Sequence, residues 1–206
     1  MFIAFMGVPG CGKSTTASRL GARLGCDTFL EPEENLWPEV VLEREVYGAF
    51  SGLTWFRNTR VVGYLKAHAI HQAGATAVVD SLFDKLLAHY MDHPSLQWLL
   101  PETDPYYTAA REMARVDYQQ LPNPTHVIFV HVDPDTWRQL LSSRGRQFDA
   151  TTSLSDYPEM QQAMYRACQR YCSQKGISFL MLKQQWSSAD ASAAELEQLI
   201  ARLGRA

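Results

Sequence analysis

The sequence has no excess of positive charge and no long apolar run. Its 206 residues contain 19 lysines and arginines against 22 aspartates and glutamates, a formal net charge of -3. A chain without a basic excess is not expected to bind nucleic acid or anionic lipid through its overall charge. No apolar run approaches the roughly twenty residues of a membrane-spanning helix, so we expect no membrane partner. A small-molecule partner fits this composition better.

Cysteines are few and are not arranged as a metal site. The four, at positions 11, 26, 168 and 172, form no CxxC pair and have no pair of histidines nearby. Zinc sites and disulfide frameworks need such clusters, so we interpret the cysteines as core thiols in a reducing compartment. The chain also opens with an apolar run that leads directly into a glycine-rich loop, which is not the pattern of a cleavable signal. We therefore expect a cytoplasmic protein.

Short apolar runs alternate with longer helical patterns along the chain. The runs cover residues 1–6, 28–32, 76–80, 126–132 and 177–182. This alternation predicts an α/β fold with a five-stranded parallel sheet flanked by helices. No repeat, low-complexity tract or linker divides the chain, so we expect a single domain over residues 1–206. In such sheets, ligands bind at the carboxyl ends of the strands.

The helical segments carry three further expectations. Residues 42–72 are mainly helical with a break at 51–52, and a second helix lies between the prolines of 101–124. The last pattern, 193–203, carries its leucines on one face and should close an edge of the sheet. The apolar segment 81–100 could either form the interface of a homodimer or pack inside its own chain.

Residues 7–15 read "GVPGCGKST" and satisfy the pattern GxxxxGK[ST] between a strand and a helix. Such a loop directs backbone N–H groups toward phosphate oxygens, and the helix N-terminus adds a favourable dipole. The motif predicts binding of ATP or another nucleoside triphosphate by six residues: Gly7, Gly10, Gly12, Lys13, Ser14 and Thr15. Lys13 would neutralise the β and γ phosphates, and the Ser14 hydroxyl would bind Mg²⁺.

Two acidic residues follow apolar runs and are therefore expected near this loop. Glu31 closes the second run and could accept the proton of an acceptor hydroxyl, although a solvated acid beside Glu33 and Glu34 is the alternative. Asp80 closes the third run and is a candidate Mg²⁺ ligand. An N-cap for the helix that follows would also explain Asp80, and both roles could hold together.

A segment with two arginines around a glycine, approximately residues 142–157, follows a predicted helix. It suits a lid that folds over the triphosphate, in which Arg144 and Arg146 stabilise charge during phosphoryl transfer. A solvated basic helix end is the alternative interpretation.

Taken in order, these motifs resemble the bacterial deoxynucleoside kinases of the deoxyguanosine and deoxyadenosine kinase type, from the phosphate loop to about Tyr171. The resemblance implies a P-loop kinase architecture with an arginine-bearing lid. It makes Glu31 of "LEP" the general base on the nucleoside 5′-hydroxyl. In "RGRQFD" it makes Arg144 and Arg146 phosphate contacts and Asp149 a contact to the deoxyribose hydroxyl.

The same resemblance implies a nucleoside-binding surface within the segment "YGAFSGLTWFRNTRVVGYL". Tyr47 would lie near the sugar 3′-hydroxyl. Counting eleven residues onward gives Asn58 in place of a glutamine that reads the base edge. Trp55 would form an aromatic wall of the base pocket, with Trp37 as another candidate wall. Without the resemblance, Tyr47 and Trp55 read as core packing.

Three arginines that the resemblance implies are missing. Their positions fall on Ser81, Leu65 and Leu140. Five other cations could reach in from neighbouring turns, namely Arg57, Arg60, Lys66, Lys85 or Arg138. Loss of a phosphate-clamping arginine without compensation lowers the rate by orders of magnitude.

The resemblance implies an enzyme, a kinase that transfers phosphate from ATP with Mg²⁺ to the 5′-hydroxyl of a deoxynucleoside, with a purine nucleoside favoured. It also implies a homodimer. A modified nucleoside or a nucleoside monophosphate is an alternative acceptor, and the second of these needs an additional cationic cradle. The alternative from another class is a nucleotide-binding structural or regulatory protein with impaired catalysis. The missing arginines favour this alternative.

Overall fold

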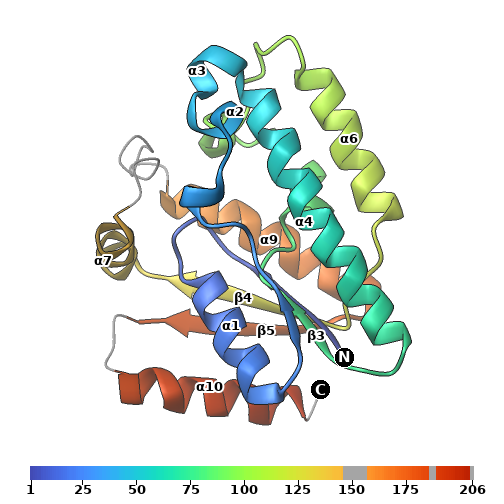
Figure 1. Cartoon of the computed structure of the whole chain (residues 1–206), viewed down its shortest axis with the longest axis vertical. Helices are drawn as coiled ribbons and strands as arrows, with labels where there is room; N and C mark the ends of the chain where they lie inside the picture. The colour runs from blue at the N-terminus through green and yellow to red at the C-terminus, as the bar shows by residue number, and fades with distance from the viewer. Residues whose placement is uncertain (146–156, 186–188, 205–206) are drawn as a thin grey trace.

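The computed structural model describes residues 1–145, 157–185 and 189–204. It confirms the predicted sheet: five strands run parallel to one another (Figure 1). The strands are Phe2–Met6 (β1), Asp27–Phe29 (β2), Ala77–Val79 (β3), His126–Val132 (β4) and Ser178–Gln184 (β5). Each coincides with one of the apolar runs in the sequence, although β2 ends at Phe29, three residues before the end of its run.

The strand order is β2-β3-β1-β4-β5. The chain leaves β1 toward β2 on one side, and β4 pairs with β1 on the other. The loop after β1 therefore lies where the order changes direction, which is where open parallel sheets bind ligands.

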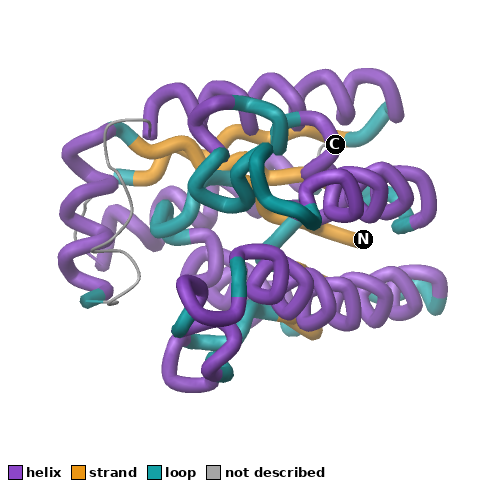
Figure 2. The backbone as a smooth tube through the Cα atoms, turned by 90° about the horizontal axis from the view of Figure 1, so that it is seen from above, coloured by secondary structure: helices purple, strands orange, loops and turns teal. Residues whose placement is uncertain are grey.

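The centre of the sheet is the centre of the core. All five residues of β1 are buried, and so are six of the seven residues of β4. Helices lie above and below the strands in the view of Figure 2. Covering both faces explains why these strands are continuous apolar runs rather than alternating ones. The cysteines at 11, 168 and 172 are buried and free, as core thiols are.

The α-helices differ widely in length. They are Lys13–Leu24 (α1), Glu39–Leu42 (α2), Arg44–Tyr47 (α3), Ala49–Gln72 (α4), Phe83–Leu86 (α5), Tyr107–Gln120 (α6), Pro134–Arg144 (α7), Tyr157–Lys175 (α9) and Ala189–Leu203 (α10). Short 3₁₀ turns cover Glu34–Leu36, Leu87–His89 and Pro94–Leu96. Within the described part of the chain, none of these helices combines the length and the apolar character that crossing a bilayer requires.

The predicted break at 51–52 is wrong, because α4 runs through both residues. The break lies at Gly48, whose φ of 84° is open to glycine and strained for other residues. Gly52 is buried inside α4, with Arg44 Cγ 3.8 Å from the position that a Cβ would take. A Cβ at this position would meet Arg44 only at ordinary van der Waals distance, and the helix continues through Gly52.

The apolar segment 81–100 packs inside its own chain. Seven of its apolar side chains are almost fully buried, namely Leu82, Leu86, Leu87, Tyr90, Met91, Leu96 and Leu100. The intrachain alternative therefore explains this segment. At the other end of the chain, Leu199 and Leu203 of α10 join the core, and α10 contacts α1.

Candidate functional site

The loop between β1 and α1 forms one wall of a cavity of about 400 Å³. All six residues that the motif assigns to the nucleotide line it: Gly7, Gly10, Gly12, Lys13, Ser14 and Thr15. Lys13 Nζ donates hydrogen bonds to the backbone carbonyls of Gly7 and Val8, both at 2.9 Å. The ammonium group thus lies within the loop, where phosphate oxygens could replace these carbonyls as stronger, charged acceptors.

Asp80 lies directly after β3 and joins the loop to the strand beside it. Its Oδ2 accepts hydrogen bonds from Ser14 Oγ at 2.7 Å and from the backbone N–H of Glu31 at 3.0 Å. Asp80 does not cap the following helix, because the N-cap position of α5 belongs to Leu82. Burial raises the pKa of Asp80 to about 6, and the nearby Glu31 carboxylate adds to the rise.

Glu31 lies on the same edge of the sheet, two residues after the end of β2. Its side chain is 30% exposed and lines the cavity, and its Oε1 lies 3.3 Å from Nη1 of Arg60. The turn that follows is fixed by the Trp37 indole, which donates a hydrogen bond to the Pro32 carbonyl at 2.9 Å. Glu31 is therefore a cavity residue with a cationic partner rather than a solvated loop acid.

Arg60, on α4, is one of the five alternative cations that the sequence offered. Its guanidinium forms two hydrogen bonds to Asp84, at 2.7 and 2.9 Å, and lies beside the ring of Phe83. Burial lowers the pKa of Arg60, but the Asp84 and Glu31 carboxylates outweigh it, so the net shift is upward. Arg60 is held charged at the cavity wall.

The other four alternative cations lie elsewhere. Arg57 pairs with Asp117 of α6, and Arg138 pairs with Asp135. Lys85 donates to the backbone carbonyls of Tyr118 and Leu121. Lys66 is exposed on α4. Among the described residues, Arg60 is thus the one of the five that lines the cavity.

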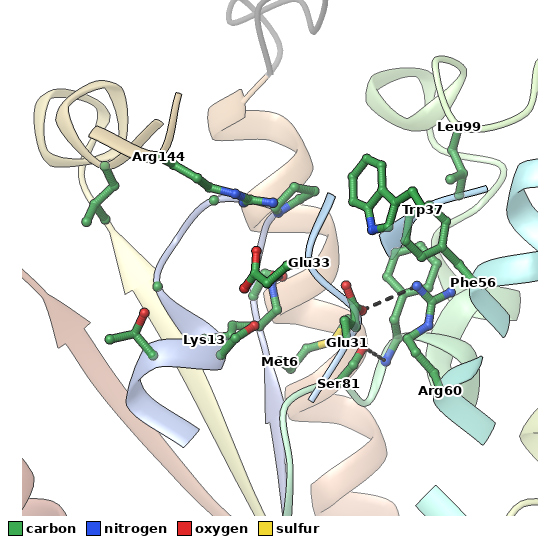
Figure 3. Close-up of a pocket in the computed structure, with 18 of the residues that line it drawn as sticks. Met6, Lys13, Glu31, Glu33, Trp37, Phe56, Arg60, Ser81, Leu99 and Arg144 are labelled. Carbon is green, nitrogen blue, oxygen red and sulfur yellow. Dashed lines mark hydrogen bonds and ion pairs between the residues drawn. The ribbon is translucent and has the colours of Figure 1, made fainter. Parts of the chain in front are cut away.

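Aromatic and aliphatic side chains form the other half of the cavity. Figure 3 shows Trp37, Phe56 and Leu99 on the side of Glu31 that faces away from Lys13. The rings of Trp37 and Phe56 meet edge to face, with centroids 5.1 Å apart. Further residues complete this wall, namely Leu53, Phe83 and Trp98. A planar, largely apolar ligand group fits such a chamber.

Three residues expected in the nucleoside pocket do not line this cavity. Tyr47 is 44% exposed at the end of α3, and Asn58 is exposed on α4, where it accepts a hydrogen bond from Arg57. Trp55 packs edge to face on the ring of Phe56. Asn58 and Trp55 face away from the cavity because of the helical period. The lining residues Leu53, Phe56 and Arg60 lie on the opposite side of α4.

Arg44 is a lining residue that the sequence did not single out. It extends from α3 and donates hydrogen bonds to the carbonyls of Trp98 and Leu99, at 3.1 and 2.7 Å. Burial lowers the pKa of Arg44. No sequence pattern connects residue 44 with residues 98 and 99, because their contact depends on tertiary packing alone. The spacing of Leu53, Phe56 and Arg60, by contrast, can be recognised in the sequence as one face of a helix.

The lid is only partly within the described residues. Arg144 is the last residue of α7 and extends across the cavity above Glu33 (Figure 3). The expected sites Arg146 and Asp149 lie outside the described residues. Of the three positions where an arginine was implied, Ser81 and Leu140 line the cavity, and Leu65 is 47% exposed.

Among the described residues, no group of three or more histidine, cysteine, aspartate or glutamate side chains is arranged to hold a metal ion. The oxygens that could bind a hard cation beside the loop are the Ser14 hydroxyl and the Asp80 carboxylate.

Known proteins match this chain through structure rather than sequence. No family model matches the sequence, and no curated protein matches it significantly. A structure of deoxyadenosine kinase from M. mycoides with bound dATP matches with a TM-score of 0.70 at 16% identity, covering 99% of this chain and 100% of that chain.

Two further structures of deoxyadenosine kinase from M. mycoides cover 100% of both chains at 18% identity. The one with bound dCTP matches with a TM-score of 0.68, and the one with products dCMP and a flexible dCDP with 0.61. Such low identities show the fold and leave the activity open. The chain therefore has the fold of P-loop deoxynucleoside kinases, as its motifs predict.

Proposed function

We propose that this chain transfers the γ-phosphoryl group of ATP, or of another nucleoside triphosphate, to the 5′-hydroxyl of a deoxynucleoside. The single observation that carries the proposal is one cavity with two unlike halves: a phosphate loop on one side, an aromatic chamber on the other, and Glu31 between them. The matched structures hold dATP, dCTP and dCMP, which supports a deoxynucleoside as acceptor. Following the sequence resemblance, we expect purine nucleosides to be preferred.

In this proposal Glu31 accepts the proton of the 5′-hydroxyl, the oxygen attacks the γ-phosphorus, and ADP leaves with the bridging oxygen. Arg60 contacts Glu31 at 3.3 Å and holds its carboxylate at the cavity wall. Lys13 and Arg144, with Arg146, stabilise the negative charge of the transferring group. The aromatic chamber places the hydroxyl, which lowers the entropy cost of the reaction.

The residues beside the loop fit Mg²⁺. The Ser14 hydroxyl and the Asp80 carboxylate supply oxygen donors, which this cation prefers, and they already lie 2.7 Å apart. Bound there with the nucleotide, the ion would neutralise phosphate charge. A pKa of about 6 leaves Asp80 mostly ionised at neutral pH, so it can serve as a ligand.

The test is a panel of purine and pyrimidine deoxynucleosides with ATP and Mg²⁺, in which both ADP and the nucleoside monophosphate are measured. We expect one or more acceptors to be phosphorylated. Glu31→Gln keeps the size of the side chain and removes the base, so it should lower kcat by about 10²- to 10⁴-fold. Glu39→Gln makes the same change at the exposed first residue of α2, outside the cavity lining, and should leave kcat unchanged.

One observation favours a second candidate, a nucleotide-binding protein with impaired catalysis. Ser81 and Leu140 line the cavity where the resemblance implies arginines. This candidate expects ATP binding with no monophosphate formed from any acceptor. Turnover that Glu31→Gln abolishes would exclude it.

A further inference from the structure

The helix that carries Arg144 is hydrogen-bonded to the phosphate loop. Trp137 of α7 is 2% exposed, and its indole N–H donates to the backbone carbonyl of Pro9 at 2.8 Å. The contact joins residues 128 positions apart in the chain. The same helix packs its Leu141 side chain over the loop, so closely that a Cβ on Gly10 would lie 2.3 Å from Leu141 Cδ2.

The carbonyl that Trp137 holds belongs to the Pro9–Gly10 peptide. In a trans peptide the carbonyl and the following N–H point in opposite directions, and the described chain has no cis bond. Fixing the Pro9 carbonyl toward Trp137 therefore turns the Gly10 N–H away from it. Pro9 and Gly10 line the cavity, whereas Trp137 does not. The hydrogen bond thus favours an orientation in which the Gly10 N–H can serve a phosphate oxygen.

Trp137 is itself held in one orientation. Its ring stacks on Tyr157 of α9, with centroids 4.1 Å apart and planes 21° apart. The Tyr157 hydroxyl donates to the Val132 carbonyl and lies 3.0 Å from Gln161 Oε1, which accepts from the Val132 N–H at 3.0 Å. The indole donor is therefore fixed to the carboxyl end of β4.

We propose that Trp137 is a positioning residue for phosphate binding, which orients the Pro9–Gly10 peptide and couples the loop to the helix that presents Arg144. The proposal rests on the proposed binding of a nucleoside triphosphate at residues 7–15 and is independent of the acceptor. Its readout is the affinity for ATP and ADP, both of which carry a β-phosphate.

The experiment compares Trp137→Phe, which keeps an aromatic ring and removes the donor, with the matched control Tyr64→Phe. The Tyr64 hydroxyl donates to another proline carbonyl, that of Pro122, at 2.9 Å, outside the cavity lining. Isothermal titration should show Kd for ATP and ADP raised about tenfold in Trp137→Phe and unchanged in Tyr64→Phe. The KM of the acceptor should be unchanged in both.

The outcomes separate the inference from the proposed function. If the wild-type protein binds no ATP, both the inference about Trp137 and the proposed function are wrong. Wild-type protein that binds ATP, with an equal Kd in Trp137→Phe, would remove the inference alone. If Trp137→Phe folds poorly, the comparison of Kd values is replaced by a measurement of hydrogen exchange at the Trp137 indole N–H of the wild-type protein. Exchange should slow when ADP is added, because coupling between the loop and the indole is reciprocal, and an unchanged rate would overturn the proposal.

Discussion

The pair formed by Arg60 and Asp84 allows stability and catalysis to be separated by mutation. Both side chains are nearly buried, at 10% and 5% exposure, and two hydrogen bonds join them. Removing one partner leaves a buried charge without its counterion. We expect Arg60→Met and Asp84→Leu each to lower the free energy of unfolding by about 3 to 5 kcal/mol. The double variant should recover most of this loss, because an apolar pair replaces an ion pair at little net cost.

Catalysis should not recover with stability. Arg60 also contacts Glu31, so the double variant restores the packing but leaves the proposed base without its cation. We expect kcat/KM for phosphoryl transfer to remain about a hundredfold below the wild-type value, since small displacements of a reacting group cost that much. Urea unfolding measures the first quantity, and a coupled ADP assay measures the second.

The neighbouring pair of Arg57 and Asp117 is the control. It lies one turn earlier on α4, is joined by two similar hydrogen bonds, and is outside the cavity lining. Arg57→Met with Asp117→Leu should preserve kcat/KM. Two results would refute the reasoning: additive losses of stability in the Arg60 and Asp84 double variant, or wild-type kcat/KM in that variant.

Further predictions address the remaining parts of the cavity. Asp80 binds its proton more tightly when folded, its pKa being raised from 3.8 to about 6. Its contribution to the free energy of unfolding, up to about 3 kcal/mol, is therefore present below about pH 4 and lost by about pH 7. In urea unfolding across that pH range, Asp80→Asn should reduce the decrease in the free energy of unfolding with rising pH. Phe56→Ala should raise the nucleoside KM at least about tenfold, whereas Asn58→Ala should leave it unchanged; the reverse result would restore the expected role of Asn58. Arg144→Gln should lower kcat about 10²-fold with little change in the nucleoside KM, as stopped-flow or steady-state kinetics can measure.

The parts of the site that the sequence predicts are those that depend on local order or on strand topology. The phosphate loop is a contiguous motif, so its residues appear together on the cavity wall. Glu31 and Asp80 follow apolar runs, and the ends of parallel strands meet at one edge of the sheet, so both lie near the loop. Neither inference needs side-chain packing.

The structure places Asn58 away from the cavity lining for a physical reason. The count of eleven residues from Tyr47 passes through Gly48, which separates helix α3 from helix α4. A spacing of eleven residues fixes a direction only within one continuous helix, because each residue turns the helix by about 100°. When the helix is interrupted, as at Gly48, the count does not indicate which side of α4 faces the cavity. Within α4 itself, the spacing of Leu53, Phe56 and Arg60 does carry it.

The charges of the cavity explain how the missing arginines affect its two halves differently. In the aromatic half, where we propose that the acceptor binds, Arg60 supplies a cation beside Glu31, and Asp84 keeps it there. In the half formed by the phosphate loop, where we propose that the phosphate donor binds, Leu140 is apolar, and Lys13 and Arg144 are cations of the described lining. In the proposed reaction, compensation is therefore stronger for Glu31, the proposed base, than for the transferring phosphoryl group. Phosphoryl transfer in this chain should depend more steeply on Arg144 than it would in a site with an arginine at position 140.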